Sequence, residues 1–280
     1  MIITKRQQFV GGLLLTAVAL LTGCSSDDTE TAQVSRHEWH VSIPVGNAAT
    51  RSVYLDGAVL KSKWNSNQSV IAYSDETSVG TLAASASEAG DATGTSTLIT
   101  GDISGTYTAG ISTLTLYSPT KIASNTYEEY ATQDGTVEGT YGISSKDYLT
   151  ATVTVTAADA SSGLLSTSRA SFSRLQSFTK FTFSKAVKTL VFSATGMSDI
   201  TVTASDDQTD FYVALPLAGE VVYSITGTTD GGTVYSVQAT GTLTHGNYYT
   251  ATIDFNTPID ITTTINNWGD GGTDSDTITL

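Results

Sequence analysis

The stretch Trp39-His40-Val41-Ser42-Ile43-Pro44-Val45 places an apolar side chain at every second position. Because successive side chains of a strand point to opposite faces, this stretch predicts a strand with one buried and one polar face. No long segment of the chain has apolar residues at helical spacing, so the sequence predicts an all-β protein. The same alternation recurs at Leu114 and Leu116, Val153 and Val155, Phe178, Phe181 and Phe183, Val221, Tyr223 and Ile225, and Tyr249, Ala251, Ile253 and Phe255.

Short turn signals separate these strands. Asp230-Gly231-Gly232 lies between two apolar stretches and predicts a tight hairpin, and His245-Gly246-Asn247 predicts a second turn leading into Tyr248. Strands joined by tight turns run antiparallel, so we expect antiparallel, sandwich-like sheets.

The N-terminus resembles a bacterial lipoprotein export signal. Lys5 and Arg6 precede an apolar stretch at residues 9–21, which is too short to span a bilayer. Leu21-Thr22-Gly23-Cys24 then places small residues before the only cysteine of the chain, as in a lipobox. We therefore expect residues 1–23 to be a signal peptide, Cys24 to be lipidated, and residues 24–36 to form an acidic tether. The alternative is that Cys24 is a free, buried thiol.

The charge of the chain limits its partners. Its formal net charge is −14, and removal of Lys5 and Arg6 with the signal makes it about −16. Such an acidic surface argues against nucleic acid or anionic lipid as a partner. With its one cysteine used for the lipid, the mature chain has none for disulfides, so a hydrophobic core must hold it together.

The length suits two domains. A single sandwich has about 100 residues, and far more than that follow the signal. Asp159-Ala160-Ser161-Ser162-Gly163 interrupts the strand pattern, and residues 164–175 are expected to form a helical turn or an irregular crossover. We therefore predict an N-terminal sandwich at 37–165 and a C-terminal sandwich at 166–280. A polar stretch at 83–97 predicts a long surface loop.

The sequence offers no catalytic or metal-binding constellation. His37 and His40 would point to opposite faces of a strand, as would the carboxylates of Glu128-Glu129. The acidic positions 270, 274 and 276 miss the spacing of a calcium loop, and no nucleophile elbow or phosphate loop is present. We expect no enzyme activity, no metal and no cofactor.

A series of short motifs in a set order resembles the fimbrillins, the subunits of type V pili on certain gut and oral bacteria. The matching segments are the lipobox at Cys24, Ala49-Thr50-Arg51, Trp64 with Val70-Ile71-Ala72-Tyr73, Phe211-Tyr212-Val213-Ala214-Leu215-Pro216, Gly231-Gly232, residues 243–249, and Ile265-Asn266-Asn267-Trp268.

The resemblance implies two transthyretin-like β-sandwich domains in tandem and assembly with other fimbrial subunits by donor-strand exchange. A lipidated precursor reaches the outer membrane, a protease cuts after Arg51 and removes the first strand, and the C-terminal strand of another subunit fills the gap. Arg36 is the alternative cleavage site, and a further alternative is that the first strand is permanent. The displaced face would be Trp39, Val41, Ile43 and Val45, and the donor residues Ile259, Ile261, Ile265, Ile278 and Leu280.

A rival interpretation is a surface glycan-binding lipoprotein of an uptake system. Trp39, Trp64, Trp268 and the tyrosines would then serve as aromatic platforms for sugars. Exposed tryptophans would favour this function, and a detachable first strand would favour the fimbrial one. Asp276-Thr277-Ile278 also resembles a three-residue O-glycosylation acceptor, with the sugar on Thr277.

Overall fold

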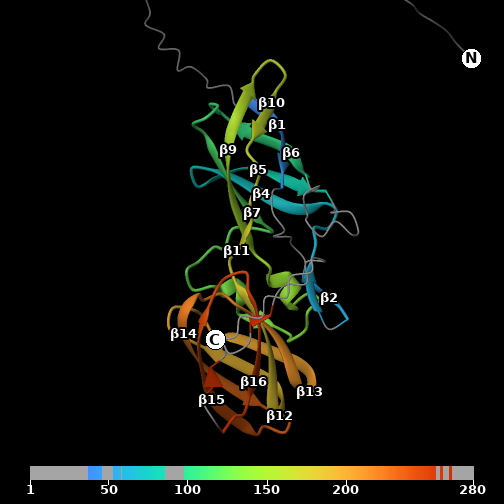
Figure 1. The fold of residues 1–280 in the computed structure, drawn as a ribbon, viewed down its shortest axis with the longest axis vertical. Helices are drawn as coiled ribbons and strands as arrows, with labels where there is room; N and C mark the ends of the chain where they lie inside the picture. Colours follow the sequence, from blue (N-terminus) through green and yellow to red (C-terminus); the bar gives the residue numbers. More distant parts are fainter. Residues whose placement is uncertain are drawn as a thin grey trace, which may run out of the picture. The chain divides into compact units, whose positions relative to one another are not determined.

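The computed structural model describes residues 37–45, 53–57, 59–85, 98–256, 259–260 and 265–266. Within these ranges the chain is built from strands (Figure 1), and the prediction of an all-β protein with a tandem two-domain architecture is confirmed. The expectation of purely antiparallel sheets is wrong, because β10 (Leu164–Thr167) pairs parallel with β1 (His37–Pro44) and β16 (Tyr248–Ile253) pairs parallel with β12 (Ser177–Ser193). The helices in the same ranges are two short 3₁₀ turns, η1 (Glu128–Tyr130) and η2 (Ile143–Lys146). No helix among the described residues is long and apolar enough to span a membrane.

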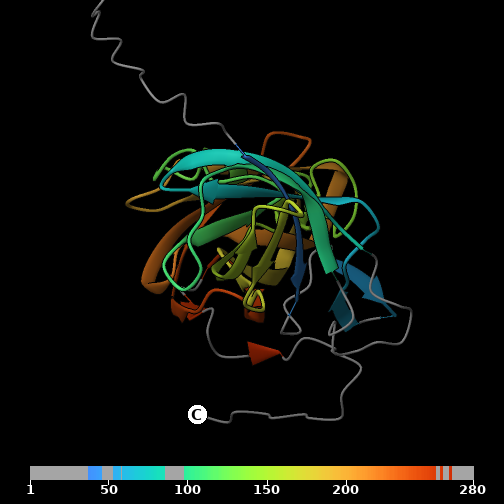
Figure 2. The same cartoon turned by 90° about the horizontal axis from the view of Figure 1, so that it is seen from above.

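The first sheet closes on itself. Its strand order is β10-β1-β6-β5-β4-β7-β9-β11, and β10 also pairs with β9, so that only β11 lies outside a continuous ring. Figure 2 shows the curvature of its strands from above. The strands are β1 (His37–Pro44), β4 (Gln68–Ser74), β5 (Thr77–Ala84), β6 (Leu98–Gly105), β7 (Thr113–Ser118), β9 (Leu149–Asp159), β10 (Leu164–Thr167) and β11 (Ser173–Arg174).

The second sheet is organised by two long strands. β12 pairs with β13 along most of its length, with β16 at its start and with β14 at its end. Register shifts between Thr182 and Thr189 mark a bend in β12. The part of β12 before the bend pairs with β16, and the part after it pairs with β14. The strands are β8 (Thr132–Gln133), β12 (Ser177–Ser193), β13 (Ile200–Leu215), β14 (Gly219–Thr228), β15 (Val234–Leu243), β16 (Tyr248–Ile253), β17 (Ile259–Asp260) and β18 (Ile265–Asn266).

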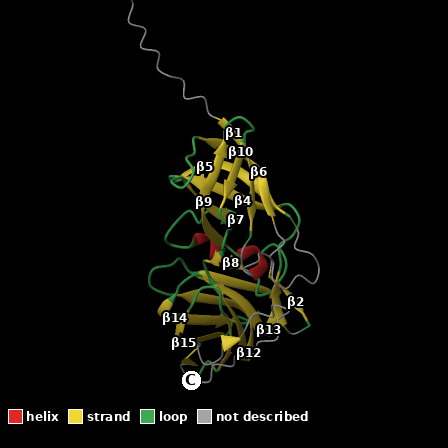
Figure 3. Cartoon of the chain, turned by 45° about the horizontal axis from the view of Figure 1, so that its top comes forward, coloured by secondary structure: helices red, strands yellow, loops and turns green. Residues whose placement is uncertain are grey.

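The predicted turns are present. Gly232, in the hairpin between β14 and β15, has φ +83°, and Gly246, before β16, has φ +84°. Both values lie in the left-handed region that glycine adopts without steric cost. The expected helical turn at 164–175 is wrong: the segment contains β10 and β11, which both pair with β9, and residues 168–172 connect them without a helix. Figure 3 shows the helices of the described residues in red. Residues on both sides of the predicted 165/166 boundary thus share one sheet, and the boundary itself stays a prediction.

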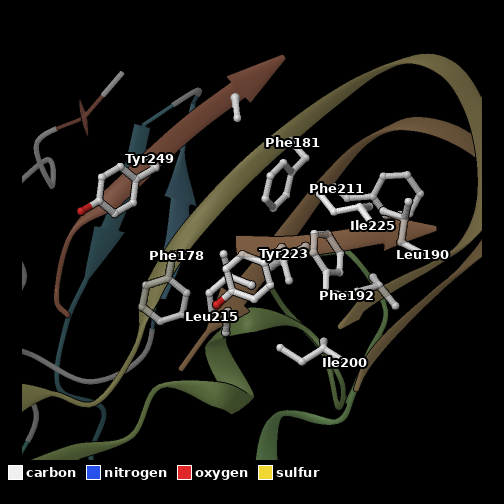
Figure 4. Packing of buried hydrophobic residues seen from close by; sticks show 14 of the residues in the cluster. Phe178, Phe181, Leu190, Phe192, Ile200, Phe211, Leu215, Tyr223, Ile225 and Tyr249 are labelled. Carbon is white, nitrogen blue, oxygen red and sulfur yellow. The ribbon is translucent and has the colours of Figure 1, made fainter. Parts of the chain in front are cut away.

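Two separate hydrophobic cores fill the described part of the chain. The first lies inside the ring and contains Trp39, Leu116 and Phe172 among others. The second contains the aromatic residues of β12, β13 and β14 shown in Figure 4. It also includes Val53 and Leu60 from a small hairpin formed by β2 (Val53–Asp56) and β3 (Val59–Ser62).

A buried polar network surrounds the carboxylate of Asp147. Arg174 Nε donates to Asp147 Oδ1 at 3.0 Å, and Gln176 Nε2 donates to the same oxygen at 2.7 Å. Gln176 Oε1 in turn accepts from Tyr130 Oη at 2.9 Å and from the backbone of Tyr148. Only 6% of the Arg174 side chain and none of the Asp147 side chain is exposed. A buried carboxylate requires such partners, because desolvating an unpaired charge is costly.

We predict that Arg174→Met lowers the free energy of unfolding by about 3–5 kcal/mol, because it leaves the Asp147 carboxylate buried without its cation. Adding Asp147→Asn should restore part of this loss, since no uncompensated charge remains. Lys188→Met, which breaks the exposed pair with Asp230, serves as the control and should leave the unfolding midpoint near that of the wild type. Urea denaturation measures all three; equal effects of Arg174→Met and Lys188→Met would contradict the prediction.

Candidate functional site

β1 is the strand that closes the first sheet. It pairs antiparallel with β6 over its full length, from His37 opposite Gly105 to Pro44 opposite Leu98. On its other side it pairs parallel with β10 at His40 and Val41. Both edges of β1 are therefore hydrogen-bonded. Withdrawal of β1 would separate β6 from β10 and open the ring.

The inner face of β1 is buried as its alternation predicts. Trp39 is 4% exposed, and Val41, Ile43 and Val45 are fully buried. The intervening His40 and Ser42 are exposed. The strand thus occupies a row of four apolar sites, spaced two residues apart, in the first core.

Trp39 is held in its site by a hydrogen bond and by an aromatic contact. Its Nε1 donates to the carbonyl of Gly105 at 2.9 Å, and its ring meets Tyr107 edge-to-face at 6.3 Å between centroids. Gly105 has φ +147°, and a Cβ there would lie 2.9 Å from Tyr107 Oη, so this close approach requires glycine. Burial raises the pKa of Tyr107 to about 12.

Further contacts hold β1 along its outer face and at its end. His40 Nδ1 bonds Asp102 Oδ1 of β6 at 2.9 Å in an exposed pair. Val45 forms a parallel bridge to Ala170, whose N–H donates to the Pro44 carbonyl at 2.9 Å. Arg169 Nη1 donates to the Val45 carbonyl at 3.3 Å. The contacts at the end of β1 involve Arg169 and Ala170, whose part in the site was not predicted from the sequence.

The chain moves from one core to the other directly after β1. Val45 belongs to the first core, whereas Val53 and Leu60 of the following hairpin belong to the second. Arg51 falls in the connection between them, outside the described residues. Cys24 and Arg36 likewise lie outside the described residues.

Two of the five predicted donor residues lie in described strands, and the other three lie outside the described residues. The backbone of Ile259 lies in β17, paired with Ala239 of β15, and that of Ile265 lies in β18, paired with Tyr249 of β16. Each of these pairings involves two residues. Ile261, Ile278, Leu280 and the glycosylation candidate Thr277 lie outside the described residues.

The structure also locates the residues of the rival interpretations. Trp39 and Trp64 are 4% and 1% exposed, and Trp64 packs edge-to-face on Phe172 at 5.2 Å. Neither tryptophan therefore offers a platform to a sugar in this state, and Trp268 lies outside the described residues.

Glu128-Glu129 lie in the 3₁₀ helix η1 rather than in an extended segment, which corrects the sequence-based expectation. Among the described residues, no group of three or more His, Cys, Asp and Glu side chains is placed to hold a metal ion.

Comparison with known proteins gives matches among solved structures. No protein-family model and no curated protein matches the chain. A cell adhesion protein of Bacteroides uniformis, described as putative, matches with 12% identity and a TM-score of 0.40, covering 79% of this chain and 92% of that one. The tip fimbrial protein Mfa3 of Porphyromonas gingivalis, truncated at its C-terminus, matches with 8% identity and a TM-score of 0.35, covering 78% and 95%. A fimbrial protein of Bacteroides ovatus matches with 8% identity and a TM-score of 0.37, covering 86% and 55%. These three solved structures are thus fimbrial or cell adhesion proteins of Bacteroides and Porphyromonas.

Proposed function

We propose that this chain is a structural, non-catalytic subunit of a surface fimbria, built from two transthyretin-like domains and assembled by donor-strand exchange. It is exported as a lipoprotein through Cys24, and cleavage after Arg51 releases β1. The position of β1 carries the proposal. This strand, the first among the described residues, completes a closed sheet, and its buried face consists of four apolar side chains.

The two cores explain why the connection after β1 is a suitable place to cut. Cleavage after Arg51 would leave β1 held only by its noncovalent contacts with β6, β10 and the first core. The new N-terminus would directly precede Val53, which is 1% exposed in the second core and paired with Ser62. The rest of the chain therefore keeps its anchor while β1 becomes replaceable. Cleavage at Arg36 would remove the lipid tether but leave β1 in place.

The energetics favour replacement over an empty groove. Exposing the four inward side chains of β1 costs about 1.5–3 kcal/mol each, on the order of 6–12 kcal/mol together. A nanomolar complex requires about 12 kcal/mol of net binding free energy. An incoming strand that fills the same sites and adds ladder hydrogen bonds on both sides therefore supports a tight noncovalent polymer, after its ordering cost is met.

The C-terminal segment fits the donor role by pattern and by its weak attachment. Ile259, Ile261 and Ile265 keep the spacing of alternate positions, as do Ile278 and Leu280. Among the described residues, β17 and β18 pair with β15 and β16 over two residues each, so release of these pairings breaks few ladder bonds. We propose that this segment of one subunit replaces β1 of the next, with the lipidated precursor in the outer membrane and the polymer on the cell surface.

We predict that Arg51→Ala prevents assembly. Cells producing the variant should carry a lipidated monomer, whereas the wild type should give a ladder of high-mass species with a mature N-terminus at Ser52. The measurement combines N-terminal mass spectrometry with a non-denaturing gel of surface extracts. Arg36→Ala is the matched control and should assemble normally. A normal ladder from Arg51→Ala would refute the assigned cleavage site.

A second prediction tests the row of apolar sites directly. An excess of a synthetic peptide with the sequence of residues 37–45 should keep processed subunits monomeric, because it refills the groove. The peptide with Ile43→Asn should be at least about tenfold weaker, since it buries an unpaired amide in an apolar site. The peptide with Ser42→Asn changes the exposed face and should block as well as the original. Equal potency of the two altered peptides, measured by size-exclusion chromatography, would argue against strand replacement.

A further inference from the structure

A surface hollow of about 500 Å³ lies away from β1. Its lining includes Tyr117 at the end of β7, residues 121–125 and Tyr127 of the following segment, and His245. The chain has 27 acidic residues, yet none of the described residues lining the hollow is acidic. Lys121 and His245 supply the basic groups instead. The volume lies within the range of about 300–1,000 Å³ typical of small-molecule sites.

Two tyrosine rings hold the cation of this hollow in place. Lys121 Nζ lies 5.4 Å from the ring centroid of Tyr73 and 5.8 Å from that of Tyr117. The two rings meet edge-to-face at 5.4 Å. Lys121 also pairs with Glu76, whose side chain is 81% exposed. Because this carboxylate is so exposed, its pair with Lys121 is weak, and Lys121 is also a lining residue of the hollow.

The segment that forms the wall is braced from several sides. The backbone N–H of Ala123 donates to Glu129 Oε1, and that of Ser198 donates to the Thr126 carbonyl at 2.6 Å. Tyr127 has φ +59° and ψ +40°, a left-handed conformation that is uncommon for an aromatic residue. Residues in such conformations persist where the surroundings fix them, often at ligand sites. The hollow is therefore pre-organised, which lowers the entropic cost of binding.

We propose that this hollow binds an acidic sugar residue of a glycan. Sugar C–H groups pack against tyrosine rings, and hydroxyl groups of the sugar bond the polar side chains of Ser124 and Asn125. His245 Nε2 bonds the Pro216 carbonyl at 2.8 Å, which fixes the imidazole ring in the lining of the hollow. The carboxylate of the sugar pairs with Lys121. This ligand site goes beyond the proposed assembly role and does not depend on strand exchange.

The test is binding of the full-length chain to an array of oligosaccharides that end in sialic or uronic acids, with their neutral counterparts beside them. We expect binding to the acidic members only. Lys121→Gln should weaken it about tenfold, because a charge-assisted contact is lost. Asn125→Ala should weaken it as well. Lys180→Gln is the matched control, since Lys180 also lies over a tyrosine ring, 5.8 Å from the Tyr212 centroid, and pairs with Asp210 outside the hollow.

Each outcome decides the proposal. Acidic-glycan binding that is weakened by Lys121→Gln and Asn125→Ala, and unchanged by Lys180→Gln, supports it. Absence of binding to every acidic glycan overturns it, as does equal binding to the neutral counterparts. Acidic-glycan binding that none of the three variants changes also overturns it, because the ligand then binds elsewhere. Thermal melting of each variant confirms that the fold is retained.

Discussion

The first sheet depends on one strand, β1, that is paired on both sides: along its full length with β6, and at His40 and Val41 with β10. β1 joins β6 to β10, and its inner face supplies four side chains to the core. The backbone groups that it satisfies on β6 and β10 would otherwise be left as open edges. Only another extended segment with apolar side chains at alternate positions satisfies both the backbone and the core. Under the proposed strand exchange, the same constraint defines which segments could replace β1.

The second core does not share this dependence. Its aromatic side chains come from β12, β13, β14 and β16, all of which follow residue 176, together with contributions from the β2–β3 hairpin and residues 130–148. The network around Asp147 joins these earlier residues to Arg174 and Gln176. None of these groups belongs to β1. Loss of β1 thus opens one core and leaves the other intact.

The sequence predicts a part of the fold where the backbone conformation requires a particular side-chain pattern. Alternation identified β1 and most of the buried strands, and glycine identified the turns at Gly232 and Gly246, because only particular residues suit those conformations. The pairing of β1 with β10 was missed. β10 has four residues with Leu165 as its one buried side chain, too short for a period to be seen. The hollow was missed because Tyr117 and His245 are far apart in sequence and meet only in the folded chain.

The positions of β1 and of the hollow suggest that assembly and ligand binding are physically separable. Around the ring, β6, β5 and β4 separate β1 from β7, the strand that carries Tyr117, on one side, and β10 and β9 separate them on the other. β7 pairs with β4 and β9, and Lys121 contacts Tyr73 and Tyr117 of β4 and β7 rather than any residue of β1. An incoming strand with the inward pattern of β1 would restore the ring without disturbing these pairings. A polymer built by strand replacement would therefore present the hollow of each subunit unchanged, and repetition along the fibre would convert a weak single-site affinity into firm attachment.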